Sequence, residues 1–302
     1  MRRRKFLRYT GTGLLGLGLG AVPAGNIIRA AGSNAPDAVW VENGEPAALL
    51  QAAIEAYGGM RRFITDGDVV VIKPNIAWDR APEFASTTNP ELVAALVKVC
   101  REAGAKEVKV FDRTCNNPRR CYRSSRIEEV AKSAGADVDQ VRDYLFTDIS
   151  LANGEELSEW PIYRDYLEAD KVINVPIAKV HSMSTVTVGL KNLMGVMGGD
   201  RGSIHNRFTT KLIDIDQEIL PTLTIVDAYR VLMHNGPVGG DLADVKTART
   251  LIMSDCTVTA DALALRLFDY QMDQVEHIKE AYRRGLNKYA LDGVNLKTVN
   301  LS

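Results

Sequence analysis

Residues 171–211 read KVINVPIAKVHSMSTVTVGLKNLMGVMGGDRGSIHNRFTTK and join a strand pattern to a dense set of polar side chains. The apolar run 172–175 predicts a buried strand, which Pro176 ends. Between residues 179 and 211, five Lys or Arg side chains accompany one acid, Asp200, and two of the four histidines of the chain. This mixture of cations and imidazoles predicts a site that holds an anion and exchanges protons.

Similar short apolar runs recur along the chain and alternate with helical patterns. The predicted strands are 69–73, 108–111, 172–175, 223–226 and 250–253, and the predicted helices are 45–64, 89–103, 126–134, 210–219, 257–268 and 271–284. Strands that alternate with longer helical segments are typical of crossover units. The sequence therefore predicts an α/β fold, a mostly parallel sheet covered by helices, as a single domain over residues 38–302. A small inserted subdomain over residues 113–165 is an alternative.

The N-terminus is similar to a twin-arginine export signal. Residues 3–8 read RRKFLR, a Gly-rich run follows at 10–22, and Val22-Pro23-Ala24 offers small residues for cleavage. The run is too short and too rich in glycine for a stable membrane span. We therefore predict a signal peptide over residues 1–24, a linker over residues 25–37, the twin-arginine export machinery as a partner, and a periplasmic or extracellular location. A basic tail and an uncleaved membrane anchor are the alternatives.

The charge balance limits the partners of the remaining chain. Residues 1–24 carry five basic and no acidic side chains, so the formal net charge of −1 leaves −6 on the rest. A mildly acidic body argues against nucleic acid or an anionic membrane surface as a partner. A small anionic molecule must therefore bind in a local basic pocket.

Polar side chains follow the predicted strands at their carboxyl ends, where open parallel sheets bind ligands. They are Lys73 and Asn75 after the first strand, Asp112 and Arg113 after the second, Lys179 and His181 after the third, and Asp227 after the fourth. We expect these groups to meet at one edge of the sheet. Capping of helices or loops by the two aspartates is the structural alternative.

Several of these motifs together resemble the domain of unknown function 362 family. They include VIKPN at 71–75, PIAKVH at 176–181, TVGLKNLMG at 187–195 and PTLTIVD at 221–227. The resemblance covers most of the chain after residue 37. It implies a fold and a set of site residues, and it names no reaction. Many relatives resemble fusions to a ferredoxin-type cysteine cluster, which this sequence lacks.

Lysines and histidines are the strongest candidates for chemistry, because a lysine can clamp a carboxylate or phosphate while an imidazole exchanges a proton near neutral pH. We expect three residues to be catalytic, His181, His205 and Lys191, and five to bind substrate, Lys73, Asn75, Lys179, Asn192 and Arg201. A helix that begins just before Lys191 would add backbone N–H donors for an anion. A structural network of lysines paired with aspartates is the alternative.

A divalent metal ion is a second interpretation of the same region. Imidazole and carboxylate suit zinc, nickel or iron, and the candidate ligands are His181, His205, Asp227 and Asp112, although no short His–His spacing joins them. If no metal binds, we expect the two aspartates to position the bases.

The cysteines suggest a local cross-link. Cys115 and Cys121 bracket the sequence CNNPRRC, which in an exported protein predicts a disulfide. A thiolate pair that faces the site is the alternative. The four cysteines of the chain are too scattered for an iron–sulfur cluster, so none is expected.

These patterns favour an exported enzyme that acts on a small carboxylate through Lys/His anion binding and acid–base chemistry, with proton transfer on a small acid. The sequence contains no P-loop, no GxGxxG between a strand and a helix, and no G-x-S-x-G motif. The alternative function is a metal- or cofactor-binding redox-accessory protein without turnover.

Overall fold

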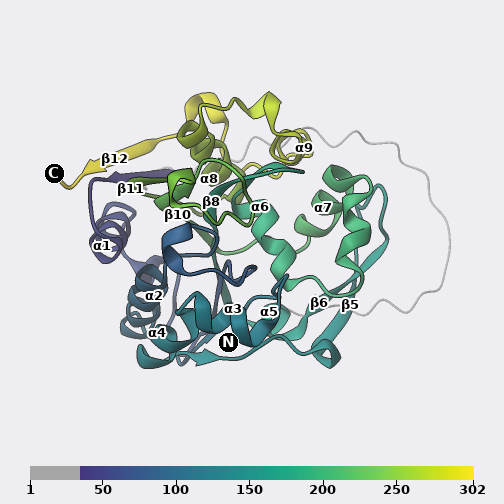
Figure 1. The fold of residues 1–302 in the computed structure, drawn as a ribbon, viewed down its shortest axis with the longest axis horizontal. Helices are drawn as coiled ribbons and strands as arrows, with labels where there is room; N and C mark the ends of the chain where they lie inside the picture. The colour runs from purple at the N-terminus through teal and green to yellow at the C-terminus, as the bar shows by residue number, and fades with distance from the viewer. Residues whose placement is uncertain (1–34) are drawn as a thin grey trace, which may run out of the picture. The chain divides into compact units, whose positions relative to one another are not determined.

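The centre of the fold is a ten-stranded mixed sheet with helices on both faces (Figure 1). The structure is a computed structural model that describes residues 35–302, which form one compact unit. The predicted signal peptide and most of the predicted linker lie outside the described residues. The segment 113–165 adds a short strand to the main sheet and forms a separate two-stranded sheet.

The structure contains a strand or helix at each position predicted from the sequence, but the helices predicted over 45–64 and 271–284 are shorter, and several short elements are added. The main sheet contains β1 (Ala38–Glu42), β2 (Val69–Pro74), β3 (Glu107–Val110), β4 (Asp137–Val138), β7 (Lys171–Val175), β8 (Ile177–His181), β9 (Thr185–Thr187), β10 (Leu223–Leu232), β11 (Val245–Ser254) and β12 (Leu296–Asn300), and the small sheet contains β5 (Phe146–Ser150) and β6 (Glu159–Tyr163). The α-helices are α1 (Pro46–Ala56), α2 (Pro90–Glu102), α3 (Pro118–Ser124), α4 (Ile127–Ser133), α5 (Arg164–Glu168), α6 (Gly189–Asn192), α7 (Phe208–Asp216), α8 (Thr257–Ala264) and α9 (Glu276–Arg283). Within residues 35–302, no helix has both the length and the apolar character needed to cross a bilayer.

The strand order confirms the predicted α/β class. The order is β12-β1-β11-β10-β7-β2-β3-β4, and the run from β10 to β4 is parallel throughout. β11 instead pairs antiparallel with β10 and with β1. The direction changes because the chain returns from β10 to β11 without a crossover α-helix.

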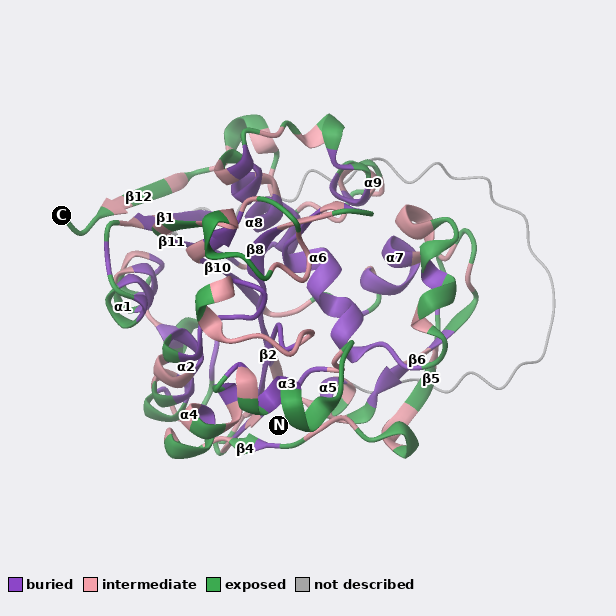
Figure 2. Cartoon of the chain, viewed as in Figure 1, coloured by how far each residue is buried: buried purple, intermediate pink, exposed green. Residues whose placement is uncertain are grey.

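Alternate residues of the strands face two separate hydrophobic clusters. On β2, Val70 and Ile72 pack into one cluster and Val71 into the other. The first cluster includes residues of α1, α2 and α4, and the second includes residues of α6, α7, α8 and α9. Strands β2, β7 and β10, between these layers, are mostly buried (Figure 2). Burial on both faces explains why the strands read as continuous apolar runs in the sequence.

A second strand directly after β7 carries the polar residues that follow Pro176 to the edge of the sheet. After Pro176 the chain continues as β8, which pairs parallel with β10 and antiparallel with β9. Lys179 and His181 therefore lie on a strand, where the sequence had indicated only the region after a strand end. α6 begins two residues after β9 and carries Lys191 and Asn192.

Candidate functional site

A cavity of about 510 Å³ lies beyond the carboxyl ends of β2, β3 and β7. It contains all eight residues predicted to be catalytic or substrate-binding: Lys73, Asn75, Lys179, His181, Lys191, Asn192, Arg201 and His205. Asp112 also lines the cavity, whereas Asp227 does not. Of the groups expected to meet at one edge because they follow parallel strands, all line the cavity except Asp227.

Lys73 and Asp112 form a buried ion pair at the base of the cavity. Lys73 Nζ lies 2.8 Å from Asp112 Oδ1, and the two side chains are 1% and 2% exposed. The other carboxylate oxygen accepts a hydrogen bond from the N–H of Ile76 at 2.6 Å. Burial lowers the pKa of Lys73, and the charge of Asp112 opposes this shift. Asp112 therefore neutralises a buried cation, as in the structural alternative drawn from the sequence.

Gly195 makes room for this ion pair. A Cβ atom at this position would lie 1.7 Å from Asp112 Oδ1 and 2.5 Å from Lys73 Nζ, both closer than non-bonded atoms approach. The glycine of the TVGLKNLMG segment is thus required by the close approach of backbone to a charged pair.

Three asparagine side chains connect strands β2 and β7 to α6. Asn192 Nδ2 donates to Asn174 Oδ1 at 2.8 Å, and Asn75 Nδ2 donates to Asn192 Oδ1 at 2.9 Å. All three are buried. Because these amides already bond to one another, they fix the position of α6 against the sheet.

The N-terminus of α6 is occupied by a carboxylate. Asp261, on α8, accepts hydrogen bonds from the N–H groups of Gly189 at 2.6 Å and Leu190 at 2.8 Å. These donors belong to the first turn of the helix and would otherwise lack partners. The prediction that this helix start would donate to a bound anion is therefore wrong.

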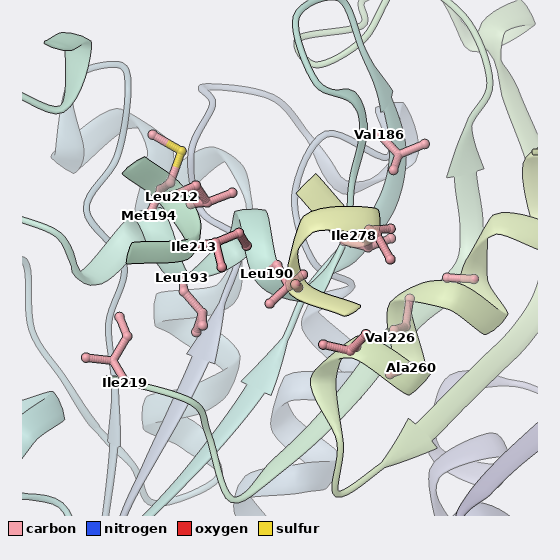
Figure 3. Packing of buried hydrophobic residues seen from close by; sticks show 14 of the residues in the cluster. Val186, Leu190, Leu193, Met194, Leu212, Ile213, Ile219, Val226, Ala260 and Ile278 are labelled. Carbon is pink, nitrogen blue, oxygen red and sulfur yellow. The ribbon is translucent and has the colours of Figure 1, made fainter. Parts of the chain in front are cut away.

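Hydrophobic packing fixes the other side of α6. Leu190 and Leu193 lie in the cluster that includes Leu212 and Ile213 of α7 and Ile278 of α9 (Figure 3). Full burial of such a side chain contributes about 1.5–3 kcal/mol. The segment that carries Lys191 is thus held by packing, by the asparagine network and by a carboxylate cap.

Lys179 and Lys191 are buried cations whose ammonium groups contact no carboxylate within the described residues. Lys179 Nζ donates to the carbonyl oxygen of Ser86 at 2.5 Å and to Asn75 Oδ1 at 3.3 Å. Lys191 Nζ lies 3.6 Å from the sulfur of Met194. Burial lowers the pKa of Lys179 to about 7 and that of Lys191 to about 8. An anion in the cavity would favour the protonated form of both.

Two arginines of the cavity are held by backbone carbonyls. Arg201 donates to the carbonyl oxygens of Arg113 at 2.8 Å and Thr114 at 2.9 Å. Arg113 donates in turn to the carbonyl oxygen of Met197 at 2.9 Å. Carbonyls orient the guanidinium groups without neutralising them, so both positive charges remain available to a ligand.

The cavity therefore carries a strong excess of positive charge. Its described lining has five cationic side chains, Lys73, Arg113, Lys179, Lys191 and Arg201, and a single carboxylate, Asp112. The body of the chain is acidic, so this excess is local. A cleft lined by one sign of charge concentrates ligands of the opposite sign.

Burial and the cationic surroundings lower the pKa of both histidines. Burial and the positive charges of Lys191 and Lys179 lower the pKa of His181 to about 3. Partial desolvation, again with Lys191, lowers the pKa of His205. The expectation that His181 titrates near neutral pH does not hold for the empty cavity. Its Nδ1 accepts a hydrogen bond from the N–H of Met183 at 3.1 Å, so the neutral ring carries its proton on Nε2.

The candidate metal ligands do not converge. Asp227 accepts hydrogen bonds from the N–H groups of Asn89 at 2.7 Å and Tyr229 at 3.1 Å, which fixes the start of α2. Asp112 is paired with a lysine. Across residues 35–302, no group of three or more His, Cys, Asp or Glu side chains could hold a metal ion. The four candidate ligands therefore form no common group of three or more among the described residues, and Asp227 takes the loop-fixing role.

The predicted disulfide is not formed in the structure. Cys115 is exposed and lines the cavity, whereas Cys121 is buried on α3 with its sulfur 3.7 Å from the carbonyl oxygen of Ala77. Both thiols are free. Helix α3 turns Cys121 toward the core, so the two sulfur atoms lie in different environments.

The sequence did not single out several residues of the cavity wall. They are Trp78, Met194, Gly195, Pro237 and Val238. Arg113, which follows Asp112 at a strand end, and Cys115 also line the cavity, and the sequence had indicated both. The apolar residues come from loops, and their sequence pattern does not distinguish a cavity wall from ordinary packing.

Comparison with known proteins gives a family match over much of the chain. Residues 70–266 match the family model described as "Domain of unknown function (DUF362)". The "Thylakoid-associated protein sll1697" of Synechocystis sp. (strain ATCC 27184 / PCC 6803 / Kazusa) is 30% identical over 213 residues, which are 68% of this chain and 65% of that protein. The chain thus spans less than two thirds of that relative's length.

Two solved structures show a more distant likeness. The lactate racemase apoprotein from Thermoanaerobacterium thermosaccharolyticum has a TM-score of 0.44 and 10% identity, over 70% of this chain and 53% of that one. A Thermotoga maritima protein has a TM-score of 0.43 and 12% identity, over 75% of this chain and 58% of that one. Similarity at this level says nothing about the activity of this chain.

Proposed function

The chain belongs to the DUF362 family, and from the contents of its cavity we propose that it is an enzyme that binds a small carboxylate and moves a proton on it. The observation that carries this proposal is the set of five cationic side chains facing one carboxylate in a cavity of about 510 Å³. That volume lies within the range of small-molecule sites.

Electrostatics explain why an anion suits this site. Lys179 and Lys191 lose most of their water on folding, and no carboxylate of the described chain compensates them. Desolvation of an uncompensated charge is unfavourable, so a bound carboxylate relieves a cost already present in the empty protein. The arginine pair adds planar donors that match carboxylate geometry.

The two histidines take different roles in this proposal. His181 is a neutral donor, because its Nδ1 is occupied by a backbone N–H and its proton is on Nε2. It would hydrogen-bond a substrate oxygen on which charge develops. His205, at the exposed edge of the cavity, supplies a neutral imidazole that accepts a proton. The bound anion raises the pKa of both rings and so favours this transfer.

Ligand binding is tested with one pair of variants. Calorimetry at pH 7 measures the affinity for lactate, malonate and inorganic phosphate in the wild type, in Lys191→Met and in Lys98→Met, which removes an exposed lysine of α2 far from the cavity lining. A lost charge-assisted hydrogen bond of about 1.5–3 kcal/mol weakens binding roughly 10- to 150-fold in Lys191→Met. Lys98→Met should bind like the wild type. Equal affinity in all three proteins would end the proposal.

Turnover has its own readout. In D₂O, the enzyme should introduce deuterium at a carbon of a bound acid, and His181→Ala should bind that acid but exchange more slowly by roughly 100-fold or more. If the wild type binds acids but exchanges deuterium into none of them, the protein is a carrier and the proposed enzymatic activity is refuted.

The location of the protein is a separate proposal. We propose export by the twin-arginine pathway, with support from the sequence RRKFLR at residues 3–8 alone. The acid that the cavity takes would then be a molecule found outside the cytoplasm.

A further inference from the structure

The three lysines of the cavity differ in what surrounds their amino groups. Lys73 is held by a carboxylate at 2.8 Å and by the carbonyl oxygen of Pro74 at 2.9 Å. Lys179 donates to a backbone carbonyl at 2.5 Å and a side-chain amide at 3.3 Å. Lys191 Nζ lies 3.6 Å from the sulfur of Met194 and 5.2 Å from the centre of the Phe208 ring, and it bonds to no oxygen of residues 35–302. Within this part of the chain, Lys191 has the most weakly bound amino group of the three lysines.

This amino group is also confined. Lys191 is 9% exposed, yet it lines the cavity, so the little surface it retains faces the ligand space. α6 is immobilised by Asp261 and by the packing in Figure 3. A lysine in apolar surroundings on a rigid segment, with a free path to a ligand, is the arrangement that nucleophilic amines require.

We propose that Lys191 is a covalent catalyst that forms an imine with the carbonyl carbon of a small 2-oxo acid. The inference rests on the proposed binding of a carboxylate and narrows its class to acids with a carbonyl next to the carboxylate. Arg201 and Lys179 would hold the carboxylate, and the adjacent carbonyl would then face Lys191 Nζ.

The chemistry balances without any further reactant. The neutral amine attacks the carbonyl carbon and forms the C–N bond, and a proton moves from nitrogen to the former carbonyl oxygen. The C–O bond then breaks, and the oxygen leaves as water with the second amine proton. An imine withdraws electrons from the neighbouring C–H bond, so His205 can accept that proton and return it.

The electrostatic surroundings favour the reactive form of Lys191. Burial lowers its pKa to about 8, and the charge of Arg201 acts in the same direction. Before an anion binds, about one Lys191 amine in ten is therefore neutral at pH 7, whereas an exposed lysine near pKa 10.4 is neutral in fewer than about one in a thousand. His205 also contacts the Phe208 ring, at 5.8 Å between centroids, which brings a proton acceptor to the same aromatic side chain.

Reductive trapping tests the proposal on the full-length protein. The chain is incubated with pyruvate and sodium cyanoborohydride at pH 7, digested and analysed by mass spectrometry. We expect a carboxyethyl group on Lys191 at a rate at least about 10-fold above that on exposed Lys98 in the same digest. Acetone, a carbonyl compound without a carboxylate, should label Lys191 at least about 10-fold more slowly than pyruvate.

Two variants complete the experiment. Lys191→Arg keeps a positive charge but cannot form an imine, so it should bind pyruvate by calorimetry and show no labelling at this position. Labelling of Lys179 or of surface lysines at the Lys191 rate would overturn the inference. If pyruvate binds the wild type and Lys191 remains unlabelled, the imine is refuted while the carboxylate site stands; if pyruvate and the other acids all fail to bind, both fall.

Discussion

Replacement of Asp112 by asparagine probes the ion pair at the base of the cavity. Lys73 and Asp112 are almost fully buried and 2.8 Å apart. Asparagine keeps an oxygen for the N–H of Ile76, so the change mainly removes the negative charge. Loss of one partner of a buried pair costs about 3–5 kcal/mol, because the other charge stays buried. We expect Asp112→Asn to lower the free energy of unfolding by about that amount at pH 7.

The pH dependence separates charge from packing. Without its carboxylate, the pKa of Lys73 falls below its already lowered value, while in the unfolded chain it remains near 10.4. Between these two values the unfolded state binds more protons, so the free energy of unfolding rises with pH. The deficit of Asp112→Asn relative to the wild type should therefore shrink between pH 7 and pH 10.

Urea unfolding of the full-length protein, followed by tryptophan fluorescence, measures both effects. A double variant, Lys73→Met with Asp112→Asn, removes both charges and should recover most of the lost stability. A single-variant cost below about 1 kcal/mol, or a deficit that stays constant up to pH 10, would refute the view that Asp112 serves to neutralise Lys73.

Two further predictions concern ligand affinity and location. The affinity for malonate should fall as the pH rises from 6 to 9, because Lys179 and Lys191, with pKa values of about 7 and about 8, lose their charge in the free protein; calorimetry that finds a constant or rising affinity would contradict the assigned cations. In cells, the wild type should fractionate with the periplasm or medium, whereas the Arg3→Lys/Arg4→Lys variant should remain in the cytoplasm; immunoblots of the fractions that show no difference would refute twin-arginine export.

The fold and the placement of the site could be predicted because strand ends are visible in the sequence. Apolar runs followed by Lys73, Asp112 and Lys179 fix the direction in which each side chain emerges, and the parallel sheet gathers them. The antiparallel β11 could not be predicted in the same way, since an apolar run carries no sign of its direction. Its pairing is decided by the connection from β10, which contains no α-helix.

The sequence does not predict which side chains and backbone groups form hydrogen bonds with each other across the fold. Asp261 lies 72 residues from Gly189 in the chain, yet its carboxylate occupies the helix start that was expected to bind an anion. Asp227 likewise bonds to the backbone of Asn89, far away in sequence. Such pairings depend on how whole layers dock, and local patterns contain no information about them. The burial of His181 and its closeness to Lys191, which lies on α6, were hidden for the same reason.

The side chains that line the cavity fall into two groups, a structural one that is bonded to the protein and a reactive one that has few bonds. Cations that emerge from the sheet, Lys73 and Lys179, are tied to a carboxylate or to oxygen acceptors, and they would be costly to move. Lys191 and His205, on the segment from α6 to α7, have few polar partners among the described residues. A group already bonded to the protein must break that bond before it reacts, whereas an unbonded one need not. Bond formation and proton abstraction should therefore reside in the segment 189–205, while the sheet provides the charge that draws the substrate to it and, through His181, a hydrogen-bond donor.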